Sequence, residues 1–236
     1  ARRARRRPHR LAAALNGDAA TTIRRMGIIA SARHAASLAA ALAIGLPAMA
    51  AIDVDALWDF SSPAKTEQRL RTALADARGD DRLIVQTQIA RTFGLRQDFD
   101  AAKRLLAEIA EPVRTAGPEA RVRYQLELGR SDASATHPPP TQTPESRARA
   151  RAAFEAARAI ARDNGLDALA IDAIHMLAFV DTAPADQVRW AREALAVVQT
   201  STQPAAKRWE ASGRHNLGYA LHQSGRHTEA LAEVAR

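Results

Sequence analysis

Two histidine–aromatic pairs in this chain share one helical spacing. His175 and Phe179 are four residues apart, as are His215 and Tyr219, and His222 lies a helical turn beyond Tyr219. Imidazoles that face one another could bind zinc, but no acidic residue is fixed at ligand spacing beside them. Two other interpretations stay open for these residues: polar or half-buried helix positions, and contacts to a binding partner.

No catalytic motif accompanies these pairs. The chain lacks His-Glu-x-x-His, Gly-x-Ser-x-Gly and Gly-x-Gly-x-x-Gly, and its 11 glycines do not cluster into a phosphate-binding loop. The absence of cysteine excludes disulfides, thiolate nucleophiles and cysteine-ligated zinc. We therefore expect no enzyme activity, no metal and no cofactor. A helical metal-binding protein or hydrolase is the remaining enzymatic hypothesis, and bound metal in mass spectrometry would be needed to support it.

The net charge of +8 is confined to one end of the chain. Residues 1–50 hold nine arginines and one acidic residue, whereas residues 51–236 hold 25 basic and 25 acidic residues. Nucleic-acid binding needs a basic face that neutralises phosphates. Because the folded part carries no net charge, we expect no nucleic-acid partner.

Residues 26–50 have the pattern of a secretory signal peptide. Arg33 and His34 form a short positive region, residues 35–46 are apolar, and Ala-Met-Ala at 48–50 precedes the cut. The apolar stretch is short for a membrane span, which needs about 20 residues. We expect a cleaved signal, a periplasmic or secreted bacterial protein, and no stable membrane insertion after cleavage. An inner-membrane anchor is the alternative.

Residues 1–25 form an arginine-rich extension before that signal. Arg24 and Arg25 resemble a twin-arginine export signal only loosely, since Ile23 stands where a polar residue is usual. We favour a mis-set start, with Met26 as the natural first residue. Either way, residues 1–25 are expected to be disordered and outside the fold.

The rest of the chain predicts an all-α fold. Aromatic residues make up only 4% of the sequence, alanine is abundant, and alternating β-branched runs are almost absent. A new helix should begin at Asp98 and end at Pro112. Three consecutive prolines predict that residues 131–144 form a loop. Proline is typical of the first helical position, and the expected helix starts include Pro63, Pro118, Pro184 and Pro204.

One helix-pair unit recurs along the chain. Its clearest copy, Asn216 to Arg236, has a small residue at Gly218, a turn at Gly225, Ala230 twelve residues after Gly218, and then Val234. Three fainter copies lie upstream. They have Ala90 with Ala102 and Leu106, Gly129 with Ala150, Phe154 and Ala157, and Ala178 with Trp190, Ala194 and Val197. The small anchors lie 39, 49 and 40 residues apart, and the excess in the middle falls on the proline-rich loop.

This unit resembles the tetratricopeptide repeat family, in a long-period variant. The resemblance covers residues 63–236 and implies helix pairs stacked into an α-solenoid. Each unit buries its face on the next, so the last unit normally needs a capping helix, and we expect the repeats to be truncated at the C-terminus. Residues 51–62 would be an N-terminal cap segment, with Trp58 and Phe60 folded back onto the open end of the first helix. A generic helical bundle is the alternative.

The resemblance also implies a concave groove that takes up a protein or peptide partner. Carried over by position, the groove-lining residues would be Thr87, Arg91, Leu126, Arg130, His175, Phe179, His215, Tyr219 and His222. Two arginines and three histidines with aromatic neighbours would suit an acidic or carboxylate ligand. We therefore expect an exported scaffold for protein–protein interaction. The alternative function is a regulatory or sensor segment of a larger membrane-anchored protein, with its output domain beyond Arg236.

Overall fold

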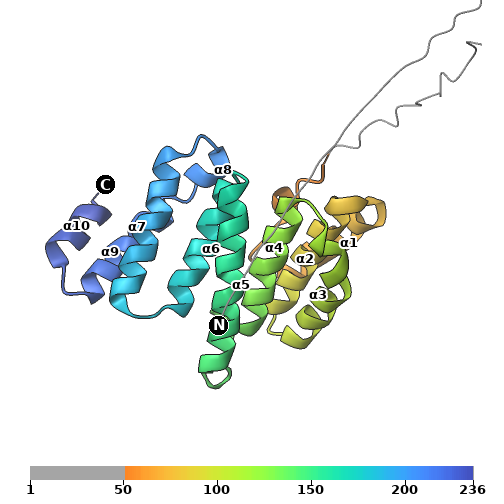
Figure 1. Cartoon of the computed structure of the whole chain (residues 1–236), viewed down its shortest axis with the longest axis horizontal. Coiled ribbons are helices and arrows are strands. Elements are labelled where there is room, and N and C mark those ends of the chain that lie inside the picture. Colours follow the sequence, from red (N-terminus) through yellow and green to blue (C-terminus); the bar gives the residue numbers. More distant parts are fainter. Residues whose placement is uncertain (1–50, 236) are drawn as a thin grey trace, which may run out of the picture. The chain divides into compact units, whose positions relative to one another are not determined.

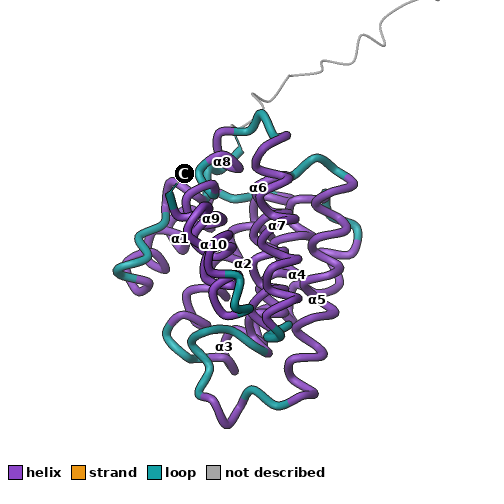
Figure 2. Tube along the Cα trace, turned by 90° about the vertical axis from the view of Figure 1, so that its left-hand side faces the viewer, coloured by secondary structure: helices purple, strands orange, loops and turns teal. Residues whose placement is uncertain are grey.

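The structure is a computed structural model that describes residues 51–235, and this part of the chain contains helices and no β-strand. The predicted all-α class is therefore confirmed. The predictions for the extension at 1–25 and the signal at 26–50 lie outside the described residues. The helices follow one another in a row in Figure 1, and Figure 2 views the same helices and loops from the α9–α10 end.

The elements are helices of one to five turns joined by short connections. In chain order they are η1 (Asp55–Leu57), α1 (Pro63–Asp76), α2 (Gly79–Leu95), α3 (Phe99–Arg114), α4 (Pro118–Asp132), η2 (Pro139–Thr141), α5 (Pro144–Asp163), α6 (Asp167–Val180), α7 (Pro184–Thr200), α8 (Pro204–Lys207), α9 (Glu210–Gln223) and α10 (His227–Val234).

Local chemistry explains most of the helix starts. Proline is the first residue of α1, α4, α5, α7 and α8, where its missing N–H would have no partner within the helix anyway. Asp98 caps α3 by accepting a hydrogen bond from the Ala101 amide at 3.1 Å. Gly225 has a φ of 73°, the left-handed conformation that closes α9 before α10 begins.

Several helix boundaries differ from the prediction. The predicted loop at 131–144 is shorter, because α4 runs to Asp132 and α5 begins at Pro144. The helix α3 continues through Pro112 to Arg114, because a proline so near the end removes one hydrogen bond of the last turns without blocking them. The last helix pair does not start as one helix at Pro204. It begins with the single turn α8, and the chain then breaks at Arg208 and Trp209 before α9.

Packing is mainly between helices that are close in the sequence. The pairs α2–α3, α4–α5, α6–α7 and α9–α10 are in contact, and contacts of α2 with α4, α5 with α6 and α7 with α9 join successive pairs. Buried apolar side chains accordingly form three clusters along the chain. The first centres on α1 to α4, the second on α4 to α7, and the third on α7, α9 and α10.

Small residues sit where paired helices cross, as the recurring unit predicted. A Cβ atom on Gly129 would lie 2.4 Å from the Phe154 ring of α5, and one on Gly218 would lie 2.8 Å from Val234 of α10. Both distances are shorter than van der Waals contact, so a Cβ atom at either position would force its neighbour to shift, which the buried Phe154 ring cannot easily do. Ala90, the anchor of the first copy, and its partner Ala102 are both buried. The remaining anchor, Ala178, is only half-buried.

Candidate functional site

Three adjoining pockets lie around α6. Pocket A, of about 200 Å³, lies between α6, α7 and α9, and pocket B, of about 170 Å³, lies between α2, α4 and α6. Pocket C, of about 270 Å³, lies between the segment 55–60, α2, α6 and the α8–α9 junction. His175 and Phe179 border both A and B, Arg91 borders B and C, and Trp209 borders A and C. We call the surface formed by these three pockets the binding face.

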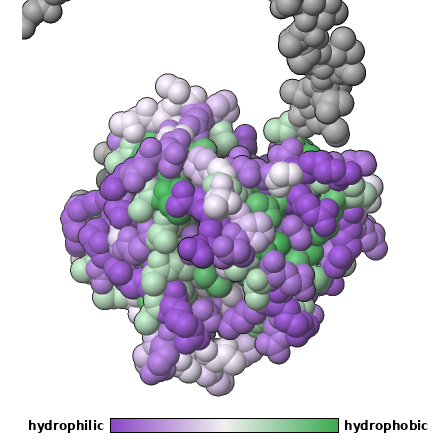
Figure 3. All heavy atoms as spheres, turned by 45° about the vertical axis from the view of Figure 1, so that its right-hand side comes forward, coloured by the Kyte–Doolittle hydropathy of each residue, from purple (hydrophilic) through white to green (hydrophobic). Residues whose placement is uncertain are grey.

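Pocket A has an apolar wall and a polar rim. Its largest apolar side chains are Ile174, Phe179, Trp190, Trp209 and Tyr219, and no aspartate, glutamate, lysine or arginine borders it. Its polar members are His175, Gln187 and Asn216. Such a pocket favours an uncharged apolar group, which the few polar side chains would orient. On the face of the molecule in Figure 3, apolar side chains likewise show in narrow strips between hydrophilic ones.

The proline-rich loop after α4 builds one wall of pocket B. Residues 134–136 border this pocket, and the Thr136 hydroxyl donates a hydrogen bond to the Gly94 carbonyl at 3.0 Å. The His137 ring is buried, stacks on Phe99 at 3.6 Å, and accepts a hydrogen bond from the Ser134 amide through Nδ1. Sequence reasoning treated this loop as a spacer between helices and missed its part in the binding face.

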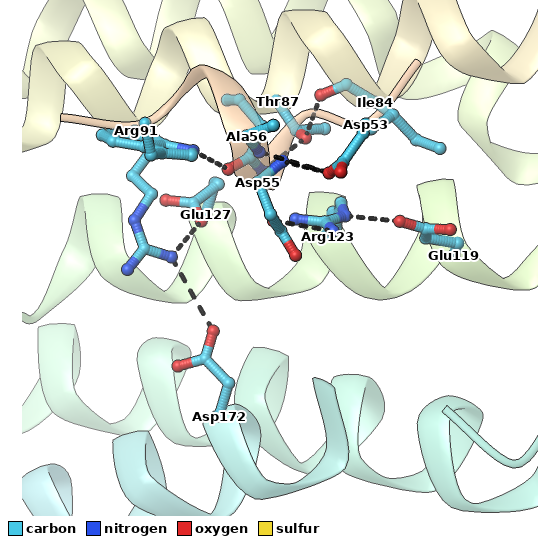
Figure 4. A network of polar contacts seen from close by, with 12 residues as sticks. Asp53, Asp55, Ala56, Ile84, Thr87, Arg91, Glu119, Arg123, Glu127 and Asp172 are labelled. Atoms are coloured by element: carbon cyan, nitrogen blue, oxygen red, sulfur yellow. Dashed lines mark hydrogen bonds and ion pairs between the residues drawn. The ribbon is translucent and has the colours of Figure 1, made fainter. Parts of the chain in front are cut away.

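Four charged side chains form a buried cluster between pockets B and C. Arg130 donates hydrogen bonds to Glu127 at 2.6 Å and to Asp172. Arg91 lies 3.4 Å from Glu127 and 3.7 Å from Asp172, as Figure 4 shows. The side chains of Glu127, Arg130 and Asp172 are 3%, 12% and 12% exposed, so the cluster is largely removed from water. Two positive and two negative charges cancel.

The two arginines of this cluster differ in how well they are paired. Burial works against the charge of Arg130, but Asp172 and Glu127 outweigh it and raise the Arg130 pKa. Burial likewise pushes the Asp172 pKa upward, and the charges of Arg130 and Arg91 overcome this and hold it below its usual range. For Arg91, burial and repulsion from Arg130 lower the pKa, and its Nε atom is buried without a hydrogen-bond partner.

Trp58 and Phe60 cover the guanidinium of Arg91. Their rings stack at 4.8 Å, and the Arg91 guanidinium carbon lies 5.5 Å from the Trp58 ring and 5.6 Å from the Phe60 ring. The Trp58 indole donates a hydrogen bond to Gln88 of α2 at 3.0 Å. These aromatic rings therefore contact α2 on the binding face, whereas the cap prediction had placed them on the open end of the first helix.

Five of the nine predicted groove residues lie together at the binding face. His175, Phe179 and Tyr219 border pocket A, and Arg91 and Arg130 border pocket B. His175 is accessible to solvent and accepts a hydrogen bond from the Asn216 amide at 3.3 Å. Neighbouring protein atoms desolvate part of the ring, which lowers the His175 pKa and favours the neutral form although Asp172 opposes this.

The other four predicted residues do not border any of the three pockets. Thr87 and Leu126 are buried, at 0% and 1% exposure, because they point into the helix-packing core. His215 borders a separate hollow with Arg214 and Glu233. His222 lies beside His227 at the α9–α10 turn, with their Nδ1 atoms 3.1 Å apart.

Sequence reasoning also missed Glu127, Asp172, Trp209 and Asn216. Glu127 and Asp172 each lie three residues before a predicted groove residue, so the i, i+3 helical neighbours of those residues were the available signal. Asn216, the neighbour of His215 in the sequence, borders pocket A together with Tyr219 and contacts His175. No sequence signal pointed to Trp209.

Within residues 51–235, no three histidine, cysteine or acidic side chains are grouped as metal ligands. In the same range, no helix combines the length and the hydrophobicity needed to cross a bilayer. Comparison with protein-family models, with curated proteins and with solved structures gave no match for this chain.

Proposed function

We propose that this chain is a tetratricopeptide-like scaffold that binds a segment of another protein at pockets A and B of the binding face and carries no catalysis of its own. The observation that carries the proposal is the adjacency of pockets A and B across His175 and Phe179. Two apolar hollows side by side suit two apolar side chains of one polypeptide segment.

The helix packing supports the repeat part of this proposal. Contacts run between neighbouring helices along the chain, and glycines occupy the crossings at Gly129 and Gly218. This is the pattern expected of helix pairs that stack one on the next. We further propose export to the periplasm, which rests on the signal pattern of residues 26–50.

The charged cluster changes what the partner is expected to look like. Arg130 is saturated by Glu127 and Asp172, so it has little attraction left for an acidic partner segment. A double charge reversal, Arg91→Glu with Arg130→Glu, would place four carboxylates in one buried cluster and unfold the protein. The partner preference is therefore assigned to apolar side chains, and the test must avoid the cluster.

The test is capture of a partner from periplasmic extract by the full chain and by the double variant Phe179→Ala, Tyr219→Ala. We expect the variant to lose the captured protein because both side chains border pocket A. Leu231→Ala is the matched control, since Leu231 is 72% exposed on α10 and borders none of the three pockets. Equal capture by the double variant and the control, with unchanged circular dichroism, would contradict the proposal.

A further inference from the structure

Pocket C differs from the other two pockets in its chemistry. Trp58 and Phe60 form one aromatic side, Trp209 forms another, and arginine side chains line the space between them. Its volume of about 270 Å³ is near the lower limit of pockets that hold small organic molecules. A space of this size suits a molecule of one or two rings.

Most charges that border pocket C are already paired. Arg123 donates to Asp55 at 3.2 Å and to Glu119 at 2.8 Å, as Figure 4 shows. Asp172 accepts from Arg130 across the cluster described above. These contacts remove Arg123, Asp55 and Asp172 from the charges that a ligand would encounter.

Two guanidinium groups in pocket C have donors to spare. Arg208 is exposed, and its side chain makes no ion pair or hydrogen bond with the rest of residues 51–235. Arg91 has only the long contacts of 3.4 and 3.7 Å to its acidic neighbours, and its Nε–H has no acceptor. The contacts of Arg91 to Glu127 and Asp172 are long, so an anion in pocket C would still be attracted by its guanidinium charge.

The aromatic side chains are positioned to hold a flat ring. Trp58 and Phe60 are nearly parallel, with an interplanar angle of 12°, and the hydrogen bond from Trp58 to Gln88 fixes the indole. Phe60 is 64% exposed, which leaves much of its surface open to contact. Stacking of a ligand ring against such side chains would add to the attraction between its charge and the arginines.

We propose that pocket C binds a small aromatic carboxylate. Its carboxylate would accept hydrogen bonds from Arg208 and from the Arg91 edge, in the planar arrangement that guanidinium and carboxylate groups favour. Its ring would lie between the Trp58–Phe60 stack and Trp209. This binding goes beyond the scaffold function, because protein capture is assigned to pockets A and B.

Calorimetric titration of the full chain with 2-naphthoate tests the proposal, with 2-naphthamide as the neutral analogue of the same shape. We expect the carboxylate to bind and the amide to bind about tenfold more weakly or not at all. Arg208→Gln should weaken 2-naphthoate binding about tenfold, and Phe60→Ala should weaken it several-fold. Both side chains are exposed, so neither change should disturb the fold.

Arg104→Gln is the matched control, because Arg104 is an exposed arginine of α3 outside pocket C. This variant should bind 2-naphthoate like the unchanged chain. The proposal is overturned if 2-naphthoate gives no binding at millimolar concentration, if the amide binds equally well, or if Arg208→Gln and Arg104→Gln behave alike. The Phe179→Ala, Tyr219→Ala variant should retain 2-naphthoate binding, so failure of either proposal is recognised separately.

Discussion

Arg130 of α4 and Asp172 of α6 are joined by a charge-assisted hydrogen bond, and each side chain is only 12% exposed. The pair links two helices that are separated in the chain by the proline-rich loop and α5. Buried charges stay charged only when they are paired and hydrogen-bonded. The pair therefore fixes α4 against α6 at the place where pockets B and C meet.

Loss of the carboxylate should be strongly destabilising. Asp172→Ala leaves Arg130 with Glu127 as its remaining strong partner, and breaking a buried ion pair costs about 3–5 kcal/mol in free energy of unfolding. Urea denaturation followed by circular dichroism measures this. Asp163→Ala is the control, because Asp163 is 67% exposed at the end of α5 and should change stability by less than about 0.5 kcal/mol. Similar values for the two variants would contradict the importance of the pair.

The same carboxylate makes stability depend on acidity. Burial raises the Asp172 pKa, but Arg130 and Arg91 outweigh this, so the folded-state pKa lies below the unfolded value of about 3.9. The Asp172 carboxylate therefore contributes fully to the free energy of unfolding above about pH 4, and this contribution is lost as the pH falls through the folded-state pKa. Denaturation midpoints measured between pH 2 and 7 should fall at the acid end. In Asp172→Asn the denaturation midpoint should decrease less at low pH. A variant with the same pH profile as the unchanged chain would show that Asp172 does not cause the decrease.

The crossing of α4 and α5 should not accept any side chain larger than hydrogen. Phe154 is fully buried and cannot move away, so the methyl group of Gly129→Ala overlaps its ring and should cost about 1–3 kcal/mol. Gly94→Ala is the matched control in α2, because no atom lies within 4 Å of the added Cβ. There, alanine should be neutral or stabilise by up to about 1 kcal/mol. Thermal unfolding compares the two, and a Gly129→Ala protein as stable as Gly94→Ala would refute the close crossing.

His137 should resist protonation. Burial lowers its pKa, and the Ser134 amide donates to its Nδ1, which only the neutral ring can accept. In the unfolded chain the pKa of His137 is about 6.5. As the pH falls below this value, the unfolded chain binds a proton before the folded chain does, so the free energy of unfolding declines; above it, His137 adds no pH dependence. An NMR titration should place the His137 midpoint below 6.5 and show faster exchange of the Ser134 amide after protonation. A midpoint at or above 6.5 would be the contrary result.

The elements and their crossings followed from local patterns. Proline at the first helical position, Asp98 as a cap and glycine in the turns act within a few residues, so Pro63, Pro118 and Pro184 could be assigned as helix starts directly. Gly129 and Gly218 were found because a helix crossing without room for a Cβ leaves a small residue at a fixed spacing. The end of α3 beyond Pro112 was missed because a proline in the last turns costs little.

The binding face could be predicted only in part, because it depends on the rotation of each helix. Successive residues of a helix point about 100° apart, so small differences in helix orientation decide whether a position such as Leu126 is buried in the core or open to the pockets. The sequence by itself determined the helical class and the small residues at the Gly129 and Gly218 crossings, and it singled out His175 and Phe179, which border pockets A and B. The tertiary structure alone decided that Glu127 and Asp172 neutralise Arg130, because only packing brings residues from separate helices within hydrogen-bond distance.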